Sequence, residues 1–145
     1  MTRTLTTSNP RSSDDNALMI SGPQYLDLVA PAIRVLSSRY GGWAFHSCGD
    51  WSAKIETIKT IPGLRRVDTA FSAATDPSPT DPEFFGQAFA KTGITLNARI
   101  VGAADVVLET VKRLWTRGLT LIVVTYCRDP DEQGRVYDGI HEACI

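Results

Sequence analysis

The stretch GGWAFHSCGD, residues 41–50, sets a histidine and a cysteine two positions apart in a chain that has only two histidines and three cysteines. His46 and Cys48 end a short apolar run, and side chains two positions apart in a strand point to the same face. A third soft ligand, Cys127, directly follows the apolar segment LTLIVVTY. Two thiolates and an imidazole, with a fourth position left open, form the ligand set of a catalytic zinc ion. These three residues are therefore the first candidates for a metal site.

Each of these residues also has an ordinary structural interpretation. Free cysteines are among the most buried residue types and often only pack, so Cys127 taken alone favours a core position. His141 and Cys144 lie three residues apart in a predicted terminal helix, and we interpret them as a surface histidine and a half-buried thiol. An odd cysteine count without an apolar signal segment predicts a reduced, cytoplasmic protein whose thiols are free.

Composition narrows the classes of partner. The chain has 145 residues, of which 43% are hydrophobic, and this is enough for one domain with its own core. Fifteen basic and sixteen acidic residues leave a net charge of −1, whereas proteins that bind nucleic acid or anionic membranes carry a basic surplus. No apolar run approaches the roughly 20 residues that span a bilayer. We expect a disordered tail at residues 1–13 and one domain at residues 14–145.

Helical and strand patterns alternate along the domain. Ser21 and Gln24 predict a capping box at the start of an entry helix, which Pro31 should kink or split. Asp50 and Asp81 are expected to cap two later helices. The expected strands cover about residues 43–47, 66–71, 94–100 and 119–126. The expected helices after the entry helix cover 51–59, 82–93, 104–115 and 131–143. Because the last strand is almost wholly apolar, we expect it to be buried on both faces.

This alternation predicts an α/β fold with a parallel sheet of about four strands and right-handed crossovers. Two architectures fit: a small open α/β sandwich, or half of a (β/α)8 barrel, which needs about 250 residues when complete. In both, active groups gather beyond the carboxyl ends of the strands. His46, Cys48 and Cys127 all occupy such positions in the predicted order of elements.

Several pieces of the chain match the pattern of one family. They are Ser13-Asp14-Asp15, Ile20-Ser21-Gly22-Pro23-Gln24-Tyr25, His46-Ser47-Cys48-Gly49-Asp50 and Cys127. Through them, the chain from Ser13 to Cys127 resembles the C-terminal half of the TIM barrel of the uroporphyrinogen decarboxylase (URO-D) superfamily. The H-x-C motif, a long gap and a further cysteine are similar to the methylcobamide:coenzyme M methyltransferase branch. The resemblance implies that His46, Cys48 and Cys127 bind Zn2+, which activates a thiol to accept a methyl group from a corrinoid protein.

The resemblance also points to polar residues near the substrate. Asn97 and Arg99 lie near the end of the third predicted strand, where the family places such residues, and Ser72 follows the second strand in the same way. Loop solvation or strand termination is the alternative for all three. Asp68, in mid-strand, is either an inward polar group or a partly exposed edge position. A zinc-bound histidine needs a partner for its other ring nitrogen, and the sequence does not identify that partner.

Two other functions remain open. One is decarboxylation of a porphyrinogen, as in porphyrin biosynthesis, which needs no metal. The other is a non-catalytic half-barrel, because four parallel strands leave two open edges where the family has eight strands in a closed barrel. Such a half could form a homodimer or bind a complementary N-terminal half-barrel. We expect the isolated monomer not to be a competent enzyme. Whether the chain belongs to an enzyme at all stays open, because it lacks half of the family's barrel.

Overall fold

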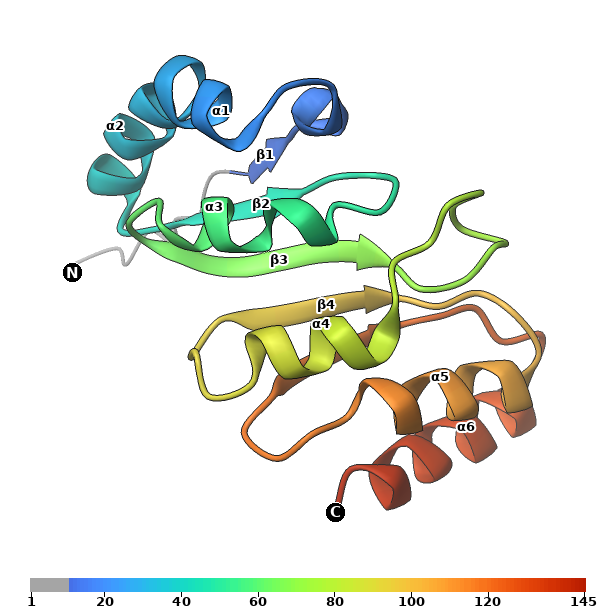
Figure 1. Ribbon diagram of the computed structural model, residues 1–145. Coiled ribbons are helices and arrows are strands. Elements are labelled where there is room, and N and C mark those ends of the chain that lie inside the picture. The colour runs from blue at the N-terminus through green and yellow to red at the C-terminus, as the bar shows by residue number, and fades with distance from the viewer. Residues whose placement is uncertain (1–10) are drawn as a thin grey trace, which may run out of the picture.

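The computed structural model describes residues 11–145 and shows an α/β fold built on one parallel sheet. Its five strands lie side by side in chain order (Figure 1): β1 (Arg11–Ser13), β2 (Trp43–His46), β3 (Leu64–Ala70), β4 (Thr95–Arg99) and β5 (Thr120–Val124). Every neighbouring pair is parallel. The fold class agrees with the prediction, and strands β2 to β5 fall where the sequence placed four strands.

The fifth strand corrects the predicted tail. Residues 1–10 lie outside the described part of the chain, but Arg11–Ser13 pair with β2 and so extend the sheet. The expectation of a disordered tail to residue 13 was therefore wrong for these three residues. The sequence Arg-Ser-Ser carries no apolar residue to mark a strand. Its conformation is set by backbone pairing with β2, which no local pattern records.

Within residues 11–145, five α-helices and two short 3-10 helices lie between the strands, and a sixth α-helix follows β5. The α-helices are α1 (Gly22–Leu28), α2 (Ala30–Tyr40), α3 (Ile55–Lys59), α4 (Pro82–Phe89), α5 (Ala104–Leu114) and α6 (Pro130–Ala143), and the 3-10 helices are Asp15–Met19 and Ser52–Lys54. Ser21 and Gln24 form the predicted capping box of α1. The entry helix divides at Val29, two positions before Pro31, as predicted. Among residues 11–145, no helix is long and apolar enough to cross a membrane.

The helices cover one face of the sheet and leave the other face open (Figure 1). Phe45, Val67 and Leu96 are neighbours in register and are fully buried beneath the helices. The alternate residues of the same strands point to the uncovered face. Strands in chain order with all helices on one face are the arrangement of a segment of a (β/α)8 barrel, because an open doubly wound sheet has helices on both faces.

An aromatic cluster joins the helical layer to the sheet. Trp51 lies at its centre, with its ring centroid 4.9 Å from that of Phe45 in β2 and 4.8 Å from that of Phe85 in α4. Tyr25 of α1 meets Phe45 edge to face from the other side. The indole Nε1 of Trp51 donates a hydrogen bond of 3.1 Å to Thr69 Oγ1. Trp51 directly follows the turn after His46, so its buried ring holds the end of that turn in the core.

Strand β5 corrects a second expectation. We expected it to be buried on both faces, but Ile122 and Val124 are 39% and 40% exposed on the uncovered face. Leu121 and Val123, which point toward the helices, are only half-buried. The reason is that β5 is an edge strand with β4 as its single described neighbour. The apolar composition of β5 is typical of a central strand, but β5 lies at the edge of the sheet.

Replacing Asp81 with alanine should lower the free energy of unfolding by about 1 kcal/mol, because its side chain caps α4. Asp81 Oδ1 accepts a hydrogen bond of 2.8 Å from Phe84 N, and Oδ2 lies 3.1 Å from Arg113 Nη2. Arg113→Ala removes only the exposed ion pair and should cost no more than about 0.5 kcal/mol. Urea unfolding of both variants checks this, and equal losses would contradict the capping role.

Candidate metal centre

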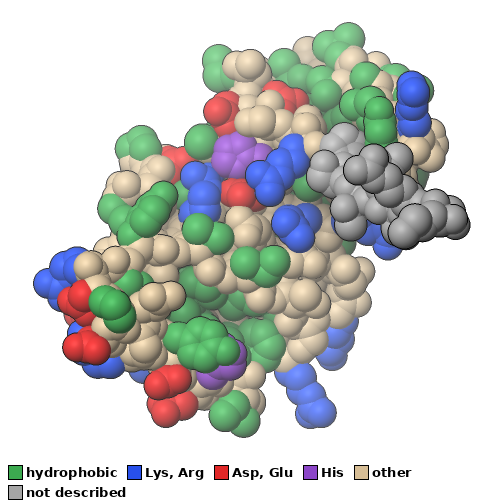
Figure 2. All heavy atoms as spheres, turned by 180° about the vertical axis from the view of Figure 1, so that it is seen from behind, with side chains coloured by type: hydrophobic (Ala, Val, Ile, Leu, Met, Phe, Trp, Pro, Cys, Tyr) green, Lys and Arg blue, Asp and Glu red, His purple; other side chains and the backbone are tan. Residues whose placement is uncertain are grey.

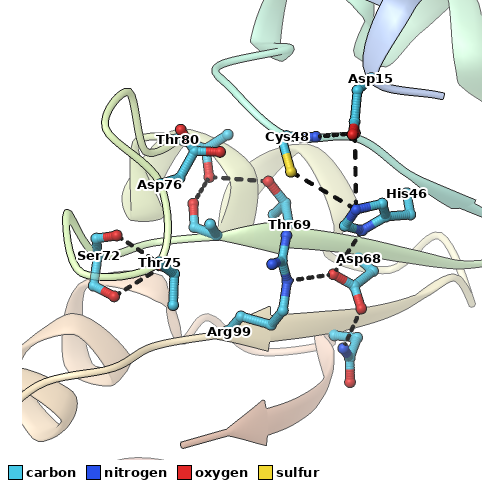
Figure 3. A network of polar contacts seen from close by, with 12 residues as sticks. Asp15, His46, Cys48, Asp68, Thr69, Ser72, Thr75, Asp76, Thr80 and Arg99 are labelled. Atoms are coloured by element: carbon cyan, nitrogen blue, oxygen red, sulfur yellow. Dashed lines mark hydrogen bonds and ion pairs between the residues drawn. The ribbon is translucent and has the colours of Figure 1, made fainter. Parts of the chain in front are cut away.

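A row of polar side chains crosses the uncovered face near the carboxyl end of β2. Ser13, His46, Asp68 and Asn97 are successive neighbours in the register of β1 to β4. Asp68 is the centre of this row (Figure 3). Its Oδ1 lies 3.1 Å from His46 Nδ1 and accepts a bond of 2.7 Å from Arg99 Nε, while its Oδ2 accepts one of 2.7 Å from Asn97 Nδ2. The row fixes the orientation of the imidazole.

Two further potential metal ligands, Cys48 and Asp15, lie on the other side of the His46 ring, next to Nε2. Cys48 Sγ lies 3.9 Å from His46 Nε2, and Asp15 Oδ1 lies 3.8 Å from the same nitrogen (Figure 3). All three ligand atoms are within 4.8 Å of one another. Tetrahedral zinc with these donors would hold ligand atoms about 3.3–3.6 Å apart, as its bond lengths require. The two distances to His46 Nε2 exceed this range by a few tenths of an ångström, and the Cys48–Asp15 pair, which lies within 4.8 Å, exceeds it by at most about 1.3 Å.

Hydrogen bonds from backbone amides, two of them to carboxylate side chains, hold the chain around these ligands. Asp14 N donates to the carbonyl oxygen of His46 at 2.9 Å, which fixes the strand just before Asp15. Cys48 N donates to Asp15 Oδ1 at 2.8 Å. The next amide, Gly49 N, donates to Asp76 Oδ2 at 2.6 Å. The turn after His46 is thus tied to the segment after β1 and to the loop after β3.

Asp76 belongs to that loop and is buried. Its second oxygen, Oδ1, accepts a hydrogen bond of 2.9 Å from Ser78 N, so each carboxylate oxygen holds a different part of the chain. Only 5% of Asp76 is exposed. A carboxylate at this depth is stable because both oxygens have hydrogen-bond donors. Asp76 is therefore a positioning residue for the Cys48 turn.

Asp68 sets the tautomer of His46. Since a carboxylate only accepts, the proton of the neutral ring lies on Nδ1, and Nε2 keeps its lone pair for the metal ligand group. Carboxylate–histidine pairs of this kind orient zinc-bound histidines and raise their basicity. Arg99 offsets the charge of Asp68, and both side chains are mostly buried, with 26% and 21% exposed. Asp68 is the partner that the sequence did not identify.

Cys127 does not join this group. It follows β5, three strands from β2, which corresponds to about 14 Å at the usual strand spacing of about 4.8 Å. Its half-buried thiol packs against the core and lines a hollow with Val136 of α6. Within residues 11–145, the one group of metal-ligating atoms has Asp15 in the place expected for Cys127. In an open sheet, the ends of β2 and β5 stay far apart.

The remaining candidates have different surroundings. Asn97 and Arg99 point to the uncovered face, and both donate hydrogen bonds to Asp68. Ser72 is buried, and its hydroxyl accepts a hydrogen bond of 2.8 Å from Val101 N, joining the loops after β3 and β4. His141 is exposed and Cys144 is half-buried, as interpreted from the sequence, and burial raises the pKa of the Cys144 thiol.

A hollow of about 230 Å³ opens beside His46 on the uncovered face. Arg11, Arg66 and Arg99 line it, together with Asp68. Figure 2 shows this face, with basic, acidic and histidine side chains gathered in its upper part and hydrophobic side chains below them. The site therefore borders a basic, solvent-open surface that fits negatively charged groups.

Comparison with known proteins adds no assignment. No family model matches the chain, and neither a curated protein nor a solved structure matches it.

Proposed function

We propose that this protein is a zinc-dependent methyltransferase-type module that activates a thiol for transfer of a methyl group from a methylcorrinoid. The activity is the one that the resemblance to the methylcobamide:coenzyme M methyltransferase branch implies. The convergence of His46 Nε2, Cys48 Sγ and the Asp15 carboxylate supports it. Asp68 behind His46 adds the outer hydrogen bond that zinc-bound histidines have.

The donor set fits zinc better than other common ions. Calcium and magnesium take oxygen ligands, whereas a thiolate with an imidazole selects a borderline metal such as zinc. Three protein ligands leave a fourth position open, as in catalytic sites. In the proposed set Asp15 replaces Cys127, because Asp15 is the residue that lies within reach of His46.

Zinc at this position would stabilise an acceptor thiol as its thiolate at neutral pH. In the proposed transfer, the acceptor sulfur would form a bond to the methyl carbon as the carbon–cobalt bond breaks, and the electron pair of that bond would remain on the corrinoid. The thiol proton passes to solvent. The chain itself contributes three ligands, the orientation of His46 by Asp68, and an open face where a methylcorrinoid could approach.

A metal-free decarboxylase of a carboxylated substrate is a second candidate. The observation that favours it is the group of arginines around the hollow beside His46, because guanidinium groups bind carboxylates. This function gives no role to the thiol of Cys48. Metal content therefore separates the two candidates.

The test is metal binding by the isolated chain, since all three proposed ligands belong to it. Metal-free protein is titrated with Zn2+, and we expect about one zinc per chain by elemental analysis. With Co2+ in place of zinc, a thiolate-to-cobalt absorption band should appear and should change when a small thiol such as 2-mercaptoethanol is added. Protein that binds no zinc would refute the proposal. A cobalt band that ignores the added thiol would refute thiol activation and leave a structural metal.

Replacing Asp68 with asparagine should weaken zinc binding by about 10–100-fold, the usual cost of losing an outer partner of a zinc ligand. The amide has the size of the carboxylate but lacks its charge, so His46 becomes a poorer ligand. Competition with a chromophoric chelator measures the affinity. Asp50→Asn is the matched control, because Asp50 lies beside the motif and accepts only from Ser52 N in the described structure. Equal affinities of both variants would rule out the role of Asp68.

A further inference from the structure

Two arginines flank a small residue on the sheet face that carries His46. In the sheet register Arg11 pairs with Ala44, and Ala44 pairs with Arg66. Paired residues point to the same face, and strands about 4.8 Å apart place the two arginine Cα atoms about 10 Å from each other. The short side chain of Ala44 therefore leaves space between two side chains that each end in a guanidinium group.

The hollow of about 230 Å³ beside His46 includes this space, because all three of these residues line it. Arg99 of β4 lines it as well. Its Nε donates to Asp68, but its Nη2 is buried and has no hydrogen-bond acceptor among the described residues. A buried donor without an acceptor is unfavourable. Arg99 therefore has a donor group that the described part of the chain leaves unsatisfied.

The lining of the hollow has an excess of positive charge. Arg11, Arg66 and Arg99 contribute three positive charges and Asp68 one negative charge, so with a neutral His46 the lining carries 3 − 1 = 2 positive charges. Within residues 11–145, neither Arg11 nor Arg66 has an acidic partner. Basic side chains lie around the upper histidine in Figure 2. A ligand with two negative charges would neutralise this excess.

We propose that this hollow binds the phosphate group of a small phosphate monoester. Such a group carries about −1.5 to −2 charges at pH 7 and has three acceptor oxygens around one phosphorus atom. Guanidinium groups match phosphate oxygens in paired hydrogen bonds, and Arg11 and Arg66 approach the hollow from opposite sides. The Ser13 hydroxyl is a further donor in its lining.

The size of the hollow limits the ligand. Its volume of about 230 Å³ is smaller than the roughly 300–1,000 Å³ of sites that enclose drug-sized molecules. The ligand is therefore a phosphate group on a short carbon skeleton. The inference goes beyond the proposed zinc chemistry and needs no metal, because none of the four charged residues in the lining is a proposed zinc ligand.

The experiment is calorimetric titration of metal-free protein with glycerol 3-phosphate, in a buffer without phosphate, sulfate or chelator. We expect one bound ester per chain. Succinate, which carries two negative charges on separate carboxylates, should bind at least about tenfold more weakly, because its charge is not concentrated on one group. No binding of the ester, or equal binding of succinate, would overturn the proposal. Tighter binding of inorganic phosphate than of the ester would overturn the monoester and indicate a site for free phosphate.

Arg66→Gln and Arg65→Gln distinguish a specific site from general charge attraction. Both variants remove one positive charge from an exposed residue of β3, but only Arg66 lines the hollow. We expect Arg66→Gln to bind glycerol 3-phosphate at least about tenfold more weakly, the usual effect of losing a charge-assisted hydrogen bond, and Arg65→Gln to bind it as the wild type does. Equal affinities of the two variants would contradict the assignment. Because the protein is free of metal throughout, these results are independent of whether it binds zinc.

Discussion

Replacing Cys48 with alanine should reduce bound zinc from about one per chain to almost none. The variant keeps only His46 and Asp15 as protein ligands, and two ligands on a solvent-open face bind zinc weakly. Loss of a mere outer partner already costs about 10–100-fold in affinity, so loss of the thiolate should cost at least about 100-fold. Elemental analysis after dialysis measures the zinc content, and competition with a chelator measures the zinc affinity.

Cys127→Ala is the matched control for this variant. It removes one thiol of similar exposure from the same rim of the sheet, and the structure keeps Cys127 out of the metal ligand group. We expect it to bind zinc as the wild type does. Loss of zinc in Cys127→Ala, with retention in Asp15→Asn, would show that Cys127 is the third ligand and that β5 moves toward β2. Apo-protein unfolding curves distinguish a lost ligand from a lost fold.

Replacing Trp51 with alanine should lower the free energy of unfolding by about 3–5 kcal/mol, the usual range for a large aromatic side chain in a core. Trp51 is fully buried, and it meets Phe45, Phe85 and Phe89 edge to face. Each such pair contributes about 0.5–1.5 kcal/mol beyond burial of area. Urea unfolding followed by circular dichroism measures the change.

Trp51→Phe tests how much of the stability depends on keeping an aromatic ring in the cluster. Phenylalanine keeps one aromatic ring in the cluster but loses the hydrogen bond to Thr69 and part of the contact area. We expect a loss of about 1–2 kcal/mol, clearly smaller than for alanine. A loss below about 1.5 kcal/mol for Trp51→Ala would mean that the cluster collapses into the cavity, and the central role of Trp51 would then be wrong.

Local patterns in the sequence predicted the parts of the fold that local interactions determine. The capping box of Ser21 and Gln24 depends on residues three apart, and the break near Pro31 depends on one ring. Strands β2 to β5 were located within about two residues by apolar runs. Strand β1 was missed because only its pairing with β2 gives it an extended conformation. The exposure of β5 was missed because an edge strand and a central strand can have the same composition.

In the candidate site too, residues marked by a local pattern were predicted, and residues brought in by strand pairing were not. His46 and Cys48 were predicted because their two-residue spacing is itself a local signal. Asp68 reaches His46 only through the register of β2 with β3, and Asp15 only through the pairing of β1 with β2. Polar residues inside expected strands are the one sequence signal that could have pointed to Asp68. Cys127 was grouped with the others because strand ends share a rim, but a shared rim does not fix distances along it.

The two carboxylate oxygens of Asp76 couple the ordering of two loops. One oxygen binds the amide next to Cys48 and the other binds Ser78, in the loop that leads to α4. A ligand that immobilises the Cys48 turn should therefore stabilise the ordered β3–α4 loop. By linkage, ordering of that loop should strengthen binding of the ligand by the same free energy. Substitutions in residues 76–78 would then change affinity at the candidate metal centre without altering its three ligands.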